Sequence, residues 1–99
     1  MRLIVRGTIR QPSPALCVAK EHAILLRFGA NLRRIRTGLH LSQEALADKS
    51  GFDRTYISLL ERGKRNLSLL NLCRLAEALN TTITELTTAT HDATHAESA

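Results

Sequence analysis

The sequence predicts an all-α fold, a compact bundle of about five helices in one domain. Apolar residues make up 43% of the 99 residues, which is enough for one modest core. Only three residues are aromatic, so this core is expected to be aliphatic and mainly Leu, which suits a helical bundle better than a β-sandwich. Apolar residues also recur at spacings of three and four, between residues that typically start or stop helices.

The chain begins with a basic segment, residues 1–20, which we separate as an N-terminal arm. It holds no acidic residue and four basic ones, Arg2, Arg6, Arg10 and Lys20. Its first ten residues suit either a short strand or a flexible arm. We expect residues 21–87 to form the folded domain and residues 88–99, which lack apolar periodicity, to form a disordered tail. The net charge of +5 favours nucleic acid as a partner, although a merely soluble basic protein would share it.

The first predicted helix runs over Pro14–Thr37. Ser13 and Pro14 suit the N-cap and the first helical position. Apolar residues then follow at helical spacing, but the phase of this pattern changes near Gly29. We therefore expect a helix that is bent or interrupted at Gly29.

Two short helices with a tight turn between them are predicted over Leu41–Gly63. Ser42 is a good N-cap for the first helix, and Gly51 stands where that helix should end. Asp53 is expected to cap the second helix, which ends at Gly63. Two helices of about two turns each, joined through a Gly-containing turn, are the helix-turn-helix pattern.

The second of these helices is expected to have one apolar and one polar face. Ile57 and Leu60 lie three residues apart and point inward, which leaves outside Arg54, Thr55, Ser58 and Arg62. A helix start that offers Arg and Thr, with the positive end of the helix dipole, suits a groove lined by phosphates and base edges. Further groups able to hold backbone phosphate follow directly, namely Lys64, Arg65 and Asn66.

Two more helices are expected before the tail. Ser68 should cap a helix over Leu69–Leu79, with Asn80 as a left-handed C-cap. Its apolar stripe comprises Leu69, Leu72, Leu75 or Ala76, and Leu79. Thr82 should cap a short helix over Ile83–Leu86. Cys73 lies among these leucines and is expected to be a buried small apolar residue.

Residues Phe28–Leu86 resemble the Cro/repressor-type helix-turn-helix domain of the XRE family, whose fold is lambda-repressor-like. Four pieces in this order carry the resemblance: LRRIR at Leu32–Arg36, LSQEALA at Leu41–Ala47, DRTYISLLERG at Asp53–Gly63 and LCRLAEALN at Leu72–Asn80. Within that family, DRTYIS followed by ERGKRN looks most like the controller proteins of restriction–modification systems. The resemblance implies a sequence-specific transcriptional regulator that binds double-stranded DNA.

The resemblance also has two structural implications. Arg36 and Glu61 stand where this family commonly has a buried or half-buried ion pair between its first and third helices; the alternative is two independent surface charges. His40 departs from the family, which usually has a left-handed Gly at that position. His tolerates this conformation, or Gly38 takes the role instead.

A homodimer is expected, because one such domain contacts only a few base pairs and a palindromic operator offers two half-sites. By resemblance, the fourth and fifth helices would form the interface, with Leu79, Ile83 and Leu86 as its residues. Ile83 and Leu86 are the candidate exposed anchors. The alternatives are that both close the core of the monomer, or that exchanged N-terminal arms form the dimer.

The DNA contacts divide into base reading and phosphate binding. Arg54, Thr55 and Leu59 are the candidate base readers, with Arg54 matched to guanine and Leu59 to a thymine methyl. The alternative for Arg54 is an intramolecular pair with Asp53 or another nearby acid. The candidate phosphate ligands are Gln43, Tyr56, Ser58, Lys64, Arg65 and Asn66.

Other functions are disfavoured. No Ser is tied to a His–acid pair and no Gly-rich phosphate loop is present, so we expect no enzyme, no cofactor and no small-molecule ligand. His91 and His95 lack a third ligand, so no metal site is expected. No apolar run approaches the roughly 20 residues that span a bilayer, and two distant cysteines fit a reducing cytoplasm. The remaining alternative is an antitoxin that neutralises a toxin and also binds its own promoter.

Overall fold

The computed structural model of the chain describes residues 14–88 and contains five helices over that range. They are α2 (Pro14–Gly38), α3 (Gln43–Ser50), α4 (Arg54–Glu61), α5 (Leu69–Ala78) and α6 (Ile83–Thr87). No strand occurs between residues 14 and 88, so the predicted all-α fold is confirmed. The expected strand or arm before residue 14 and the tail after residue 88 lie outside the described residues. The boundary that we placed at residue 20 falls inside α2.

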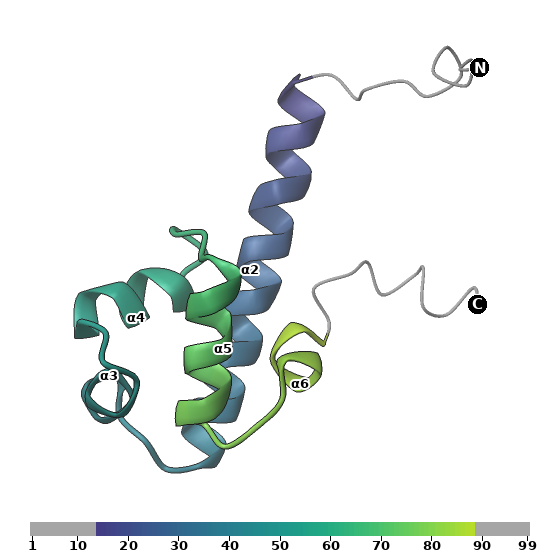
Figure 1. Ribbon diagram of the computed structural model, residues 1–99. Helices are drawn as coiled ribbons and strands as arrows, with labels where there is room; N and C mark the ends of the chain where they lie inside the picture. The colour runs from purple at the N-terminus through teal and green to yellow at the C-terminus, as the bar shows by residue number, and fades with distance from the viewer. Residues whose placement is uncertain (1–13, 89–99) are drawn as a thin grey trace.

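The long helix α2 is the axis on which the other helices assemble. Its C-terminal half packs against α4 and α6, while α3 contacts α4 and α5, and α5 contacts α6 (Figure 1). The N-terminal half of α2 extends beyond this bundle (Figure 1). The helix-turn-helix pair α3 and α4 therefore rests on one side of α2, with α6 on the other.

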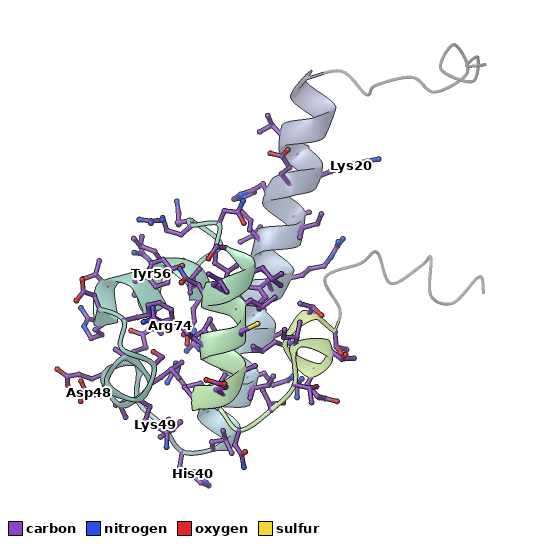
Figure 2. All side chains as sticks on the ribbon, in the orientation of Figure 1. Lys20, His40, Asp48, Lys49, Tyr56 and Arg74 are labelled. Carbon is purple, nitrogen blue, oxygen red and sulfur yellow. The ribbon has the colours of Figure 1, made fainter. Side chains whose placement is uncertain are left out.

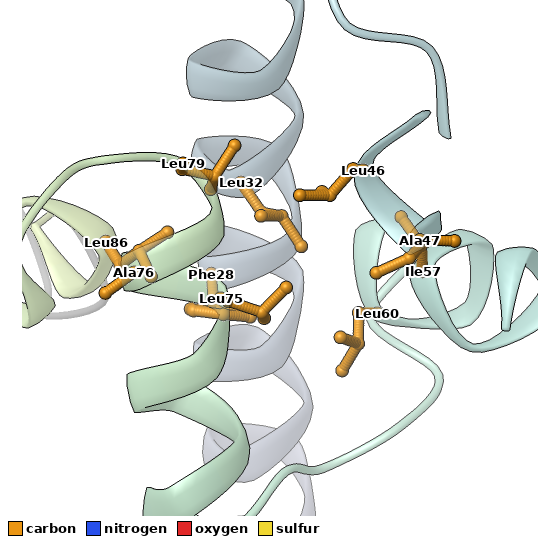
Figure 3. Packing of buried hydrophobic residues seen from close by; sticks show 10 residues of the cluster. All are labelled: Phe28, Leu32, Leu46, Ala47, Ile57, Leu60, Leu75, Ala76, Leu79 and Leu86. Carbon is orange, nitrogen blue, oxygen red and sulfur yellow. The ribbon is translucent and has the colours of Figure 1, made fainter. Parts of the chain in front are cut away.

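The core is aliphatic, as its composition predicts. Between residues 14 and 88, ten apolar residues are buried, and six of them are leucines, at least one from each helix (Figure 3). The ten are Phe28, Leu32, Leu46, Ala47, Ile57, Leu60, Leu75, Ala76, Leu79 and Leu86. The expected stripe on α5 needs one correction, because Leu69 is 69% exposed. Cys73 is half-buried rather than buried. Both lie on parts of α5 that the other helices do not fully cover.

Capping side chains define most helix starts. Ser42 accepts a hydrogen bond from the Ala45 N–H, Ser68 from Asn71 and Thr82 from Glu85, as predicted. Asp53 occupies the N-cap position of α4, but its side chain makes no capping hydrogen bond. The first turn of α4 therefore keeps N–H groups that no side-chain cap occupies.

Four residues in the described part of the chain have positive φ and end helices or shape turns. Gly51 and Gly63 have φ values of 79° and 71°, and Asn80 has 55°. His40 also adopts the left-handed conformation, with φ of 60°. His40 rather than Gly38 therefore forms the turn after α2.

The prediction that the helix is interrupted at Gly29 is wrong, because α2 is one continuous helix through this residue. Gly29 is instead the point at which α2 crosses the end of α4. A Cβ atom there would lie 2.4 Å from the Leu60 carbonyl oxygen and 2.5 Å from that of Glu61. The missing side chain allows the two backbones to approach closely.

Candidate nucleic-acid interface

A buried ion pair fixes the orientation of α4 on α2. The Arg36 guanidinium donates from Nε and Nη2 to the two carboxylate oxygens of Glu61, with Nη2 at 3.0 Å from Oε1. Its Nη1 donates to the Leu41 carbonyl oxygen at 2.7 Å, so the ion pair also holds the start of α3. The two side chains are only 10% and 3% exposed. The ion pair implied by the resemblance is therefore present, and it is not two independent surface charges.

The amide of Gln43 connects this ion pair to the start of α4. Its Nε2 donates to Glu61 Oε1 at 3.1 Å, and its Oε1 accepts from Arg54 Nη1 at 3.3 Å. Arg54 thus has an intramolecular partner, but this partner is a neutral amide rather than Asp53 or another acid. The guanidinium stays exposed and keeps its other N–H donors.

The outer side of α4 presents the predicted base-reading residues. Arg54 and Thr55 are exposed in its first turn, next to the helix start that Asp53 leaves without a side-chain cap. Leu59 is half-buried and does not belong to the core cluster. Ser58, which we predicted as a phosphate ligand, is also half-buried.

An aromatic and cationic cluster lies between α4 and the start of α5. The Phe52 and Tyr56 rings have centroids 4.9 Å apart, and the Arg65 guanidinium lies 5.3 Å from the centre of the Tyr56 ring. The Tyr56 hydroxyl accepts a hydrogen bond from Asn71 Nδ2 at 3.0 Å, which leaves its own proton for another acceptor. A hollow of about 400 Å³ opens here, lined by Gly51, Phe52, Asp53, Thr55, Tyr56, Leu59, Arg65 and Asn71.

Two polar side chains that contact the rings of this cluster were not predicted. Asn71 orients Tyr56, and Arg74 places its guanidinium 5.0 Å from the centre of the Phe52 ring. Figure 2 shows Tyr56 on α4 and Arg74 on α5 on the side of α2 that carries the helix-turn-helix. Neither role has a signal in the sequence, because both depend on how α5 packs against α4.

The loop after α4 places three predicted phosphate ligands at the surface. Lys64, Arg65 and Asn66 are all exposed. The Lys64 N–H donates to the Leu59 carbonyl oxygen at 2.9 Å, so this residue continues directly from the end of α4. Asn66 Oδ1 accepts from the Leu67 N–H at 2.8 Å, which leaves its amide nitrogen as the group for an external acceptor.

Two of the three predicted dimer residues are placed differently from expectation. Leu79 is 2% exposed and Leu86 is fully buried. Leu86 is therefore not an exposed anchor, because both leucines close the core of the monomer. Ile83 packs against the core but remains partly exposed.

Known proteins are similar to this chain in sequence and in fold. The helix-turn-helix family model HTH_3 matches residues 32–86. The chain belongs to this helix-turn-helix family. Control protein C.SmaI from Serratia marcescens is 50% identical over 77 residues, which cover 78% of this chain and 88% of that protein. Control protein C.MunI from Mycoplasma sp is 45% identical over 64 residues, covering 64% and 86%.

A solved structure extends the similarity to three dimensions. The restriction-modification controller protein C.AhdI from Aeromonas hydrophila is 52% identical and superposes with a TM-score of 0.62, covering 63% of this chain and 94% of that protein. The expected resemblance to controller proteins is confirmed. The chain is thus a DNA-binding regulator of the helix-turn-helix family, related to restriction–modification controller proteins.

Residues 14–88 lack the features of two other kinds of site. No group of three or more His, Cys, Asp or Glu side chains gathers there in a way that suits a metal ion. No helix in this range has the length and apolar character needed to cross a membrane.

Proposed function

We propose that this protein is a transcriptional regulator that binds a palindromic DNA operator as a homodimer, with the start of α4 in the major groove. The observation that carries the proposal is the exposed pair Arg54 and Thr55 at a helix start, on a frame held by the buried Arg36–Glu61 ion pair. Exposed donors at a rigid helix start match the acceptors on base edges.

Base reading is assigned to the outer side of α4. The fork of the Arg54 guanidinium matches O6 and N7 of guanine, and Thr55 can donate to a base or a phosphate. Leu59 lies one turn further along and offers an apolar surface to a thymine methyl. Arg54, Thr55 and Leu59 thus contact successive parts of the half-site, from the start of α4 to the middle of this helix.

Phosphate binding is assigned to groups on both sides of α4. Gln43 lies at the start of α3, where the helix dipole favours an anion. On the other side are the Tyr56 hydroxyl, Ser58 and the loop residues Lys64, Arg65 and Asn66. Exposed cations such as Lys64 and Arg65 supply affinity that depends on salt and not on sequence.

We base the proposed target genes on the proteins that are similar to this chain. The similar proteins named above are control proteins, one described as a restriction-modification controller, so we propose that this chain regulates restriction–modification genes. This similarity favours a regulator over an antitoxin. A methyltransferase gene and an endonuclease gene beside this one would support the assignment, whereas a small toxin gene would contradict it.

Two substitutions separate base reading from phosphate binding. Arg54→Ala should weaken operator binding by about 1–3 kcal/mol and relax the preference at one base pair. Lys64→Ala should weaken binding to all sequences alike and make the salt slope shallower by about one. Binding to operator and to random duplexes is measured across a range of salt concentrations. Equal weakening of both duplexes by Arg54→Ala would show that Arg54 contacts phosphate instead.

The dimer is proposed to form through the exposed surface of α6 around Ile83. Ile83→Glu should shift a dimer toward monomer at micromolar concentration in sedimentation velocity, with association at least about tenfold weaker, because two charges would enter the symmetric interface. Leu69→Glu is the matched control, since Leu69 is exposed on the far end of α5. If Leu69→Glu dissociates the dimer and Ile83→Glu does not, the interface does not lie on the α6 surface around Ile83. A dimer lost only on removal of residues 1–13 would indicate exchanged arms.

A further inference from the structure

We infer that Glu61 is a positioning residue for base recognition and acts on Arg54 through the amide of Gln43. The inference rests on the proposed function, since it concerns the guanidinium that we assign to a base. Glu61 ends α4, whereas Arg54 begins it. Gln43, the first residue of α3, is the group that joins them.

Glu61 is a fixed anchor for this connection. Its side chain is 3% exposed, and both of its carboxylate oxygens accept hydrogen bonds from Arg36. Arg36 is in turn bonded to the Leu41 backbone at 2.7 Å, just before the start of α3. The carboxylate therefore cannot rotate without breaking several buried hydrogen bonds at once.

The charge of Glu61 determines which way the Gln43 amide points. An ionised carboxylate only accepts, so the Gln43 group that meets Glu61 Oε1 at 3.1 Å must be the NH₂ donor. The amide oxygen is then directed away from Glu61, and it receives Arg54 Nη1 at 3.3 Å. An amide is the side chain that can donate to an anion on one side and accept from a cation on the other.

The result is that the Arg54 guanidinium is oriented before DNA arrives. A free Arg side chain samples many rotamers, and fixing it on binding costs entropy. One of its N–H groups is held by Gln43, while the rest of the planar fork remains for the base. Glu61 and Gln43 thus set how selectively Arg54 reads its base pair, without contacting that base themselves.

The first test measures Arg54 in the DNA-free protein by ¹⁵N relaxation of its Nε. We expect Arg54 Nε to become more mobile in Gln43→Met, which removes the connecting amide, and in Glu61→Gln, which removes the charge that fixes the direction of that amide. Glu44→Met, at the exposed position next to Gln43, is the matched control and should leave Arg54 unchanged. Equal Arg54 mobility in all four proteins would overturn the inference, whatever DNA the protein binds.

The second test measures discrimination with duplexes selected from a randomised library. Gln43→Met should lower the preference at the base pair read by Arg54 about two- to tenfold, and leave preferences at other base pairs unchanged. In an Arg54→Ala background the same change should have no further effect on that preference. Uniform weakening with the preference intact would make Gln43 a phosphate ligand only and overturn the inference.

Failure of the proposed function would look different in this experiment. One such result is a library that yields no preferred sequence, and another is an Arg54→Ala variant that leaves the preference at every base pair unchanged. Either result would show that the assignment of Arg54 to a base is wrong, and with it the inference that Glu61 and Gln43 affect base recognition. Glu61→Gln serves as the second variant in the binding assay once its melting temperature shows that it is folded. The sequence preference of the Glu61→Gln variant should fall at the same base pair as that of Gln43→Met.

Discussion

Arg36→Met should lower the free energy of unfolding by about 3–5 kcal/mol, because it leaves the Glu61 carboxylate buried without its counter-ion. The Glu61 side chain is 3% exposed, so water cannot replace the lost guanidinium. Removal of Arg36 also leaves the Leu41 carbonyl oxygen without the donor that reaches it at 2.7 Å. Denaturant unfolding at fixed protein concentration measures the effect.

Two controls show whether the loss comes from the unpaired carboxylate. Arg33→Met makes the same substitution at an exposed position of α2 and should change stability by less than about 0.5 kcal/mol. The double variant Arg36→Met/Glu61→Leu replaces both charges by apolar groups and should recover most of the loss. A double variant as unstable as Arg36→Met alone would mean that the loss is one of packing and not of charge.

The sequence predicts those parts of the fold that depend on local rules. Ser42, Ser68 and Thr82 were predicted as caps from their positions alone, and each makes the expected hydrogen bond. The left-handed residues Gly51 and Asn80 are likewise local features. Asp53 lies at the predicted N-cap position, but its side chain makes no capping hydrogen bond. The local rule therefore predicts the position of the cap residue more reliably than its hydrogen bond.

Burial on the last helices was harder to predict. An apolar residue on a short helix can face its own core or a second subunit, and the helical spacing is the same in both cases. Leu86 was expected to be an exposed anchor, yet it is fully buried because α6 folds back onto α2. Only the tertiary arrangement distinguishes the two environments.

The candidate site likewise combines features that neighbouring residues determine with contacts that form only between packed helices. The exposure of Arg54 and Thr55 follows from helical geometry, and that of Lys64 from its place just after the end of the helix; all three were predicted. The hydrogen bonds from Asn71 to Tyr56 and from Gln43 to Glu61 join different helices, so no spacing in the sequence indicates them. The Arg36–Glu61 ion pair also joins residues that are far apart in sequence, and it was expected only because the chain resembles a known family.

Gly29 lies where α2 crosses the end of α4, so a side chain added there should have a large effect on stability. Gly→Ala in the interior of a helix normally stabilises it by roughly 0.5–1 kcal/mol. At Gly29 the sign should reverse, because the new Cβ would lie 2.4–2.5 Å from the carbonyl oxygens of Leu60 and Glu61. These are backbone atoms that cannot rotate away, so α4 must move. We expect Gly29→Ala to destabilise the protein by about 3 kcal/mol or more.

Gly38→Ala is the matched control on the same helix, since nothing lies within 4 Å of its added Cβ. It should be neutral or stabilise the protein by about 0.4–1 kcal/mol. Gly29→Ala should also loosen DNA recognition beyond its effect on stability, because Glu61 lies at the crossing and both helices hold the ion pair. Melting curves of the two variants provide the comparison. Equal melting temperatures for Gly29→Ala and wild type would show that α2 and α4 do not cross this closely in solution.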